Sequence, residues 1–178
     1  MITKWKIDPT HSEIQFKVKH LMITTITGNF TSYELLVETE DNDFTKATKI
    51  DFAADVDSIN TGNEQRDGHL KSADFFDAAQ YPQIKFAATG FENVDNDGSY
   101  ELLGNLTIKD VTKPVKLSVE FGGVVTDAYG NIKAGFSING KINRKDFGLT
   151  WSAVTEAGGI VVSDDVRLVA EIQLIEQQ

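Results

Sequence analysis

Apolar and polar residues alternate one by one along most of this chain. In the first clear run, Ile14, Phe16 and Val18 are separated by Gln15 and Lys17. Because successive side chains of an extended strand point to opposite faces, this period of two predicts a half-buried β-strand. Similar runs begin at Ile50, Ile84, Tyr100, Val115, Ile132 and Val166, and a less regular run covers residues 30–38.

Short clusters of turn-forming residues separate these runs, at residues 41–43, 96–98, 109–110 and 127–131. Such short connections predict antiparallel hairpins. The pair Gly122-Gly123, directly after a run, predicts a bulge or bend in the strand. Pro114 is expected at the first residue of its strand, where the missing backbone donor is tolerated.

Each predicted strand has one apolar face and one polar face. About eight antiparallel strands of this kind, with little helix to cover them, must turn their apolar faces toward one another. The sequence therefore predicts a closed barrel or a sandwich. The whole chain, residues 1–178, is expected to be a single domain, since its length is typical of one domain and it contains no linker-like segment.

Several of the expected inward positions carry small residues, namely Ala54, Ala88, Gly104, Ala134, Gly140 and Ala170. Small inward residues leave volume unfilled, and a barrel of about eight strands can enclose one small ligand. Small and large residues also alternate where large side chains from facing strands fill a tapering barrel. The pattern is thus compatible with a ligand cavity and with a filled interior.

Residues 61–80 break the alternation and are the segment that predicts a helix. Thr61 is followed three residues later by Glu64, which matches the reciprocal capping pattern of a helix start. Phe75 and Phe76 stand side by side on the expected exit from this helix. Two adjacent phenylalanines on a short connector bury poorly unless they close or line an apolar opening.

Charge and composition exclude several classes of protein. The chain has 17 basic and 27 acidic residues, a net charge of −10, so nucleic acid is not expected as a partner. The acidic surface gives no electrostatic help in docking to an anionic membrane, and no apolar run is long enough to span a bilayer, so no stable membrane insertion is expected. The absence of cysteine excludes disulfides and thiolate chemistry. Residues 1–9 lack the apolar core of a signal peptide, so a cytoplasmic location is expected unless a leader was removed.

Candidate catalytic groups are few. The three histidines, His11, His20 and His69, follow no recognised ligand spacing, so neither a metal site nor a cofactor is expected. No nucleophile elbow of the Gly-x-Ser-x-Gly type occurs. The expectation is a protein without enzymatic activity. The alternative is an enzyme that uses His69 or His20 as acid or base, with Asp67 as the orienting carboxylate.

Arg66 and His69 are three residues apart and would lie on one face of a helix. They could hold the polar or anionic head of a ligand. Asp67 could instead pair with a basic neighbour and tie the helix to the sheet, which is the favoured interpretation for Asp67 alone.

Motifs along nearly the whole chain resemble the YceI-like family of bacterial proteins, also called polyisoprenoid-binding. The two most specific motifs are Arg66-Asp67-Gly68-His69-Leu70 and Asn143-Arg144-Lys145-Asp146-Phe147-Gly148. The resemblance implies an all-β fold: an extended, lipocalin-like, eight-stranded antiparallel β-barrel with a short helical insertion around residues 61–80. It also implies an elongated apolar tunnel inside the barrel.

The resemblance further implies non-catalytic binding, storage or transport of a long-chain apolar lipid, such as a polyisoprenoid, an isoprenoid (prenyl) quinone or a fatty amide. Homodimers are common in the family, so a homodimer is an open expectation here. Many members carry a secretion signal, which the given sequence lacks, and this favours the cytoplasmic branch. A ligand-free, stress-linked interaction protein stays a further alternative.

The expected wall of the tunnel consists of inward-facing apolar residues and of the helical insertion: Phe16, Val18, Phe52, Leu70, Phe75, Phe76, Phe86, Leu102, Leu106, Phe136, Ile138, Phe147 and Trp151. The expected head-group contacts are Arg66, His69 and Arg144. Each arginine could instead pair with a nearby aspartate, such as Asp67 or Asp146.

Overall fold

The computed structural model of the chain describes residues 1–151 and 162–177. In this part the chain forms eleven strands of one sheet: β1 Ile2–Ile7, β2 Glu13–His20, β3 Thr24–Phe30, β4 Tyr33–Glu40, β5 Asp43–Asp55, β6 Ile59–Asn60, β7 Gln83–Asn93, β8 Ser99–Ile108, β9 Val111–Thr126, β10 Ile132–Asn143 and β11 Val162–Glu176. The helical elements of the same part are α1 Glu64–Lys71 and the short 3-10 turns η1 Pro9–His11, η2 Val56–Ser58 and η3 Arg144–Phe147.

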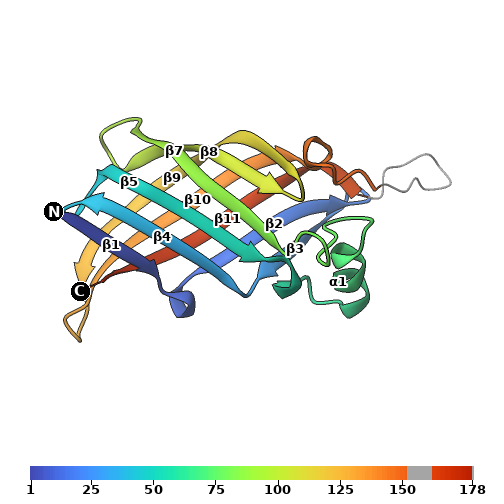
Figure 1. Cartoon of the computed structure of the whole chain (residues 1–178), viewed down its shortest axis with the longest axis horizontal. Coiled ribbons are helices and arrows are strands. Elements are labelled where there is room, and N and C mark those ends of the chain that lie inside the picture. Colours follow the sequence, from blue (N-terminus) through green and yellow to red (C-terminus); the bar gives the residue numbers. More distant parts are fainter. Residues whose placement is uncertain (152–161, 178) are drawn as a thin grey trace.

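Eight strands close into a barrel in the order β1-β4-β5-β7-β8-β9-β10-β11, because β1 pairs with both β4 and β11. All of these pairings are antiparallel, which confirms the expected eight-stranded antiparallel barrel. The remaining strands β2, β3 and β6 extend the sheet from β11. Figure 1 shows an elongated barrel with both chain ends at one end and α1 at the other.

The strand β11 spans the length of the barrel and has two partners along one edge. Leu174 lies opposite Ile7 of β1, whereas Leu168 lies opposite Phe16 of β2. The turn η1 therefore divides one strand position of the barrel between β1 and β2. In the same way, the irregular run at residues 30–38 is divided at residues 31–32 into the end of β3 and the start of β4.

The predicted hairpins are present at all four turn clusters. Backbone φ angles of 54° at Asp41, 58° at Asn96 and 57° at Lys109 place these residues in the left-handed region that tight turns use. In β9, Gly123 lies opposite Gly135 and Phe121 lies opposite Phe136, which leaves Gly122 as the extra residue of a β-bulge. The expected bulge at Gly122-Gly123 is confirmed.

The position expected for Pro114 was wrong, because β9 begins at Val111 and Pro114 lies inside the strand, opposite Asn105. Proline is tolerated there for a reason that the sequence did not show. β9 pairs with β10 only from Ser118 onward, so the missing donor of Pro114 breaks no ladder with β10.

The helical insertion is shorter than expected, since α1 covers only residues 64–71 and turns follow it. The predicted capping box was also wrong. The N-cap is Asn63, whose side-chain oxygen accepts from the backbone amide of Arg66 at 3.0 Å, and asparagine is among the strongest N-cap residues. Thr61 instead donates to Asp67.

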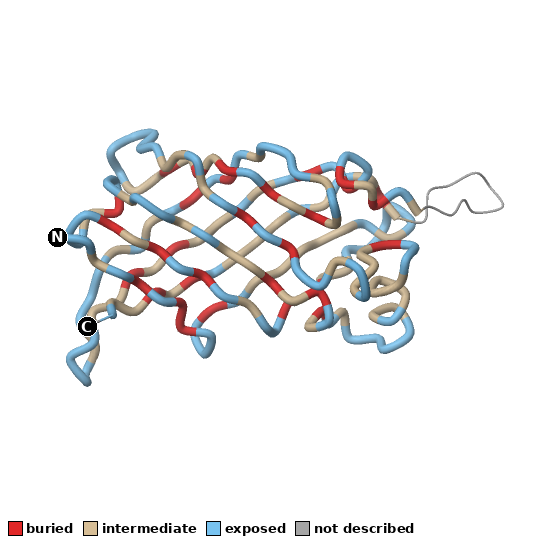
Figure 2. Tube along the Cα trace, in the orientation of Figure 1, coloured by how far each residue is buried: buried red, intermediate tan, exposed pale blue. Residues whose placement is uncertain are grey.

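The end of the barrel that carries both chain termini is filled by aromatic side chains. Ring centroids lie 4.8 Å apart for Trp5 and Phe44, 5.0 Å apart for Phe44 and Phe136, and 5.1 Å apart for Phe121 and Phe136. Trp5 is fully buried, and its indole N–H donates to the hydroxyl of Thr39 at 3.0 Å. We call these four aromatic residues the aromatic plug. Figure 2 shows that buried positions are distributed along the strands from one end of the barrel to the other.

Four of the six small inward residues fall into two groups. A Cβ added to Gly104 would collide with the Phe86 ring and lie 2.6 Å from the carbonyl oxygen of Ala87, and one added to Gly140 would collide with Leu117. Large neighbours therefore already fill these two gaps. Ala54 and Ala170, by contrast, face an internal cavity.

Candidate functional site

An apolar cavity of about 230 Å³ lies inside the half of the barrel nearer α1. Its wall includes Leu70 from α1 and Phe75 and Phe76 from the turns that follow. Among the described residues of the wall, only Gln15 and Arg144 are polar. The cavity therefore offers apolar surface to a ligand and very few groups that could orient it.

Ten of the residues expected from the sequence to line a tunnel lie in the wall of this cavity: Phe16, Val18, Phe52, Leu70, Phe75, Phe76, Phe86, Leu102, Leu106 and Ile138. Their contact with a lipid stays a prediction. Other wall residues, such as Ile14, Ile84 and Leu168, were not singled out. They occupy the same alternating positions, so the period of two could have identified them.

Three expected lining residues lie outside the wall of the cavity, and packing explains each placement. Phe136 belongs to the aromatic plug at the opposite end. Phe147 is buried in η3. The ring of Trp151 packs against His69 at a centroid distance of 4.8 Å and against Phe75 at 5.3 Å, next to the cavity rather than in its wall.

Arg66 and Asp67 both bind Thr61, the residue at which the chain enters the helical insertion. The Arg66 guanidinium donates to the Thr61 hydroxyl at 2.8 Å and to its carbonyl oxygen at 2.7 Å. The Asp67 carboxylate accepts from the Thr61 amide at 2.9 Å and from its hydroxyl at 2.6 Å. These contacts tie the insertion down, and neither side chain lies in the cavity wall.

His69 is held by residues of the insertion and by Trp151. Its Nε2 lies 3.0 Å from a carboxylate oxygen of Asp74, and its ring meets the rings of Phe75 and Trp151 edge to face. His69 is therefore oriented by Asp74 and not by Asp67. The imidazole braces the aromatic residues beside the cavity and is not part of its wall.

Arg144 is the cation of the cavity wall, and only 3% of it is exposed. Its guanidinium donates to the carbonyl oxygens of Ser163 at 3.0 Å, Leu149 at 2.6 Å and Trp151 at 2.6 Å. Burial lowers the pKa of Arg144, and the carboxylate of Asp164 at 3.7 Å opposes that shift. With its donors engaged by backbone oxygens, Arg144 holds together the chain segments around η3 and the start of β11.

A family model described as YceI-like domain matches residues 5–174. The chain belongs to the YceI-like family. A UPF0312 protein of Staphylococcus aureus (strain MSSA476) is 34% identical over 175 residues, which cover 97% of each chain.

Solved structures agree with the fold of this YceI-like protein. The crystal structure of the YCEI protein of Campylobacter jejuni superposes with a TM-score of 0.76 at 36% identity, covering 90% of each chain. Burkholderia cenocepacia BcnA has a TM-score of 0.80 at 20% identity, over 94% of this chain and 98% of its own. A domain from Saccharophagus degradans, described as polyisoprenoid binding, has a TM-score of 0.66 at 16% identity, over 97% and 98%. The last two likenesses concern the fold alone.

The described part of this YceI-like protein has neither a cluster of metal-binding side chains nor a membrane-spanning helix. In residues 1–151 and 162–177, no cluster of three histidine, cysteine, aspartate or glutamate side chains is arranged to hold a metal ion. No helix in the same residues has the length and apolar character needed to cross a membrane.

A cluster of polar side chains lies at the corner between β1 and β2 of this protein. Asp8 accepts from the Thr10 hydroxyl at 2.7 Å and the Thr10 amide at 3.0 Å, and its other oxygen lies 2.8 Å from His11 Nδ1. The hydrogen bond from the Thr10 hydroxyl, helped by His11, lowers the pKa of Asp8 to about 2. Lys133 lies 3.8 Å from Asp8 and 3.3 Å from Asp127 and links the corner to β10.

Acidification is expected to destabilise the protein through Asp8. Its pKa in the folded protein is about 2, below the roughly 3.9 of an unfolded aspartate, so the stabilisation is complete above about pH 4 and is lost as the pH falls toward 2. The variant Asp8→Asn should be less stable at pH 5 and should lose less stability between pH 4 and pH 2. Urea unfolding at a series of pH values measures both effects. Equal losses in the two proteins over that interval would contradict the assignment.

Proposed function

We propose that this YceI-like protein binds a long-chain apolar lipid in the barrel cavity and leaves it chemically unchanged. The observation that carries the proposal is the wall of the cavity, in which only Gln15 and Arg144 are polar among the described residues. The name of the similar Saccharophagus degradans domain, which is described as polyisoprenoid binding, supports the same class of ligand.

A long chain suits such a cavity on energetic grounds. Each methylene buried from water contributes about 0.8 kcal/mol, whereas association costs about 4 to 15 kcal/mol in lost translational and rotational freedom. About ten buried methylenes are therefore needed before binding becomes useful. Polyisoprenoids, prenyl quinones and fatty amides all carry chains of this kind, and short apolar molecules should bind weakly.

The head group is inferred to stay near α1, outside the deep part of the cavity. The Arg144 guanidinium is already engaged by four carbonyl oxygens, so it has little capacity for an anionic head. Arg66 is engaged by Thr61. A neutral or weakly polar head is thus favoured over a phosphate.

The enzymatic alternative needs a histidine oriented by Asp67, and the geometry does not favour it. His69 lies beside Asp74, while the Asp67 carboxylate accepts its two hydrogen bonds from Thr61. We therefore favour binding without turnover. A cytoplasmic location and a homodimer stay predictions.

Extraction of the native protein tests the proposal most directly. Protein purified without detergent is extracted with organic solvent, and the extract is analysed by mass spectrometry. Delipidated protein is then titrated with a prenyl quinone added from ethanol. We expect one class of long-chain lipid in the extract and saturable uptake of the quinone, recovered unchanged. Repeated absence of both would refute the proposal, and a chemically altered quinone would favour the enzyme.

A further inference from the structure

Three consecutive apolar residues are exposed at the hairpin between β2 and β3. Leu21 is 38%, Met22 is 59% and Ile23 is 76% exposed. We call them the apolar tip. The hairpin lies at the α1 end of the barrel (Figure 1). Its strands adjoin the cavity, because Val18 lies in the cavity wall and His20 pairs with Val162, another wall residue.

The backbone of the apolar tip is strained by the residues it carries. Leu21 and Met22 have φ angles of 53° and 60°, and the Ile23 amide donates to the His20 carbonyl at 3.1 Å. A turn with positive φ at both central residues strongly prefers Asn-Gly, because bulky side chains are disfavoured in the left-handed region. Stored strain of this kind is concentrated at binding sites.

Cations gather on the outer face of the sheet next to the apolar tip. Lys141 of β10 lies opposite Arg167 of β11, which lies opposite Lys17 of β2. Lys19 follows two residues later on the same face of β2, and it is exposed. We call these four residues the basic strip. Like charges directly opposite one another on a sheet are destabilising, so anions that approach the strip are expected to be attracted to it.

Carboxylates near the basic strip neutralise only part of its charge. Asp165 lies 3.6 Å from Lys141, one of the four members of the strip. In the described part of the chain, the other three members of the strip have no ion pair. The strip is therefore a local positive region on a chain whose net charge is −10.

We propose that the apolar tip and the basic strip dock the protein on an anionic phospholipid surface, so that the cavity can exchange its ligand with the bilayer. Three side chains are too few for a stable protein interface, which buries about 800 Å² on each partner. Apolar side chains next to lysines are, however, the combination that binds peripheral segments to anionic membranes. The reason for docking rests on the proposed function. A long-chain lipid is poorly soluble in water, so the cavity must receive it from an apolar phase.

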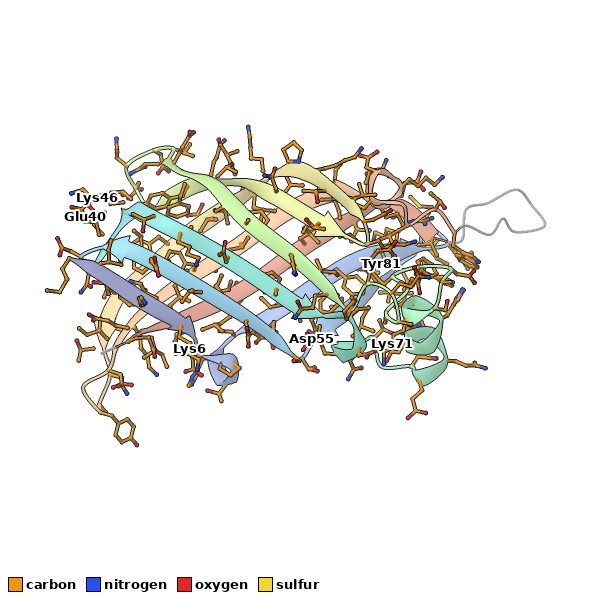
Figure 3. All side chains as sticks on the ribbon, in the orientation of Figure 1. Lys6, Glu40, Lys46, Asp55, Lys71 and Tyr81 are labelled. Atoms are coloured by element: carbon orange, nitrogen blue, oxygen red, sulfur yellow. The ribbon has the colours of Figure 1, made fainter. Side chains whose placement is uncertain are left out.

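Binding to vesicles tests the docking without any cargo. Delipidated protein is sedimented with vesicles of phosphatidylcholine alone or of phosphatidylcholine mixed with phosphatidylglycerol. We expect stronger binding to the anionic vesicles. Each lysine removed in the double variant Lys17→Gln/Lys19→Gln should lower that binding about fivefold, since a cation at an anionic surface contributes about 1 kcal/mol. The matched variant Lys4→Gln/Lys6→Gln removes the same charge from β1, away from α1 (Figure 3), and should bind like the wild type.

The apolar tip has its own pair of variants. Met22→Asp/Ile23→Asp should lose binding to both kinds of vesicle. Val124→Asp/Val125→Asp changes two exposed valines at the end of β9, near the chain termini, and should bind normally. The variant Leu21→Asn/Met22→Gly should raise the melting temperature by about 2 to 4 °C, because it removes the strain, and should still weaken binding. A merely structural turn would gain stability without that loss.

The outcomes separate the two proposals. Equal vesicle binding by the wild type and by the tip and strip variants would overturn the docking. The docking would also be overturned if the β1 and β9 control variants weakened vesicle binding as much as the tip and strip variants do. Uptake of a prenyl quinone from ethanol needs no docking, so its failure would refute the proposed cavity function while the sedimentation result stands. Tip variants that take up quinone from ethanol normally but from vesicles slowly are the expected result.

Discussion

Replacing Ala170 with phenylalanine is expected to weaken lipid binding at least about tenfold while the barrel stays folded. Ala170 lies in the cavity wall, opposite Ile138 of β10 and Ile14 of β2, which line the same cavity. The added ring takes the place of ligand, and two displaced methylenes at about 0.8 kcal/mol each already account for a tenfold loss. Titration with a prenyl quinone measures the effect, and circular dichroism reports the fold.

The matched control is Ala134→Phe, which makes the same change in the filled half of the barrel. Ala134 is 1% exposed, lies opposite Leu174 and Val124, and is not in the cavity wall. Overpacking a well-packed core costs about 1 to 3 kcal/mol, so this variant should unfold at lower urea concentration. If Ala170→Phe were destabilised as strongly as Ala134→Phe, the interior near α1 would have to be filled rather than open.

Replacing Arg144 with methionine is expected to lower the free energy of unfolding by about 2 to 4 kcal/mol. The change leaves the buried carbonyl oxygens of Leu149 and Ser163 without their donor, and each unpaired buried group costs about 1 to 3 kcal/mol. Urea unfolding at neutral pH measures the loss. Arg144→Lys should recover only part of it, because one ammonium cannot reproduce the planar set of donors.

Arg167→Met provides the control for Arg144, since Arg167 is exposed on the outer face of β11. Surface changes of this kind stay within about 0.5 kcal/mol. An Arg144→Met variant as stable as Arg167→Met would show that the buried guanidinium does not hold the segments around η3 together.

The strands could be predicted because their signal is local. In the segment that became β2, each inward residue is separated from the next by one polar residue, and no distant contact is needed to see this. The closure of the sheet into a barrel could not be derived from such a local pattern. It depends on Trp5 lying between Val37 of β4 and Glu176 of β11, a pairing across nearly the whole chain length. The barrel topology followed from the family resemblance instead.

The alternation of apolar and polar residues also could not show whether the interior of the barrel is hollow. Gly104 and Ala170 look equivalent in sequence, as small inward residues of long strands. The difference is that the ring of Phe86 lies over Gly104, while Ala170 faces open space. Strand register and side-chain rotamers decide which large side chain covers which small one. Neither can be inferred from the sequence of one strand.

The contacts of the polar residues in the candidate site also could not be predicted from the sequence alone. The sequence favoured a tying role for Asp67 and a head-group contact for Arg66, whereas both side chains bind Thr61, which the sequence assigned to the helix cap. Asn63 takes that role and leaves Thr61 free to bind both side chains. The role of Arg144 depends on carbonyl oxygens of residues 149, 151 and 163, which a motif cannot reveal.

Both chain ends lie beside the aromatic plug, at the end of the barrel remote from α1 (Figure 1). Trp5 and Glu176 are neighbours across β1 and β11, so the two ends leave the barrel close together. A fluorescent reporter or a surface tether can therefore be attached at either end without covering α1, the apolar tip or the basic strip. Protein immobilised in this way would present the α1 end of the barrel to vesicles in a uniform orientation.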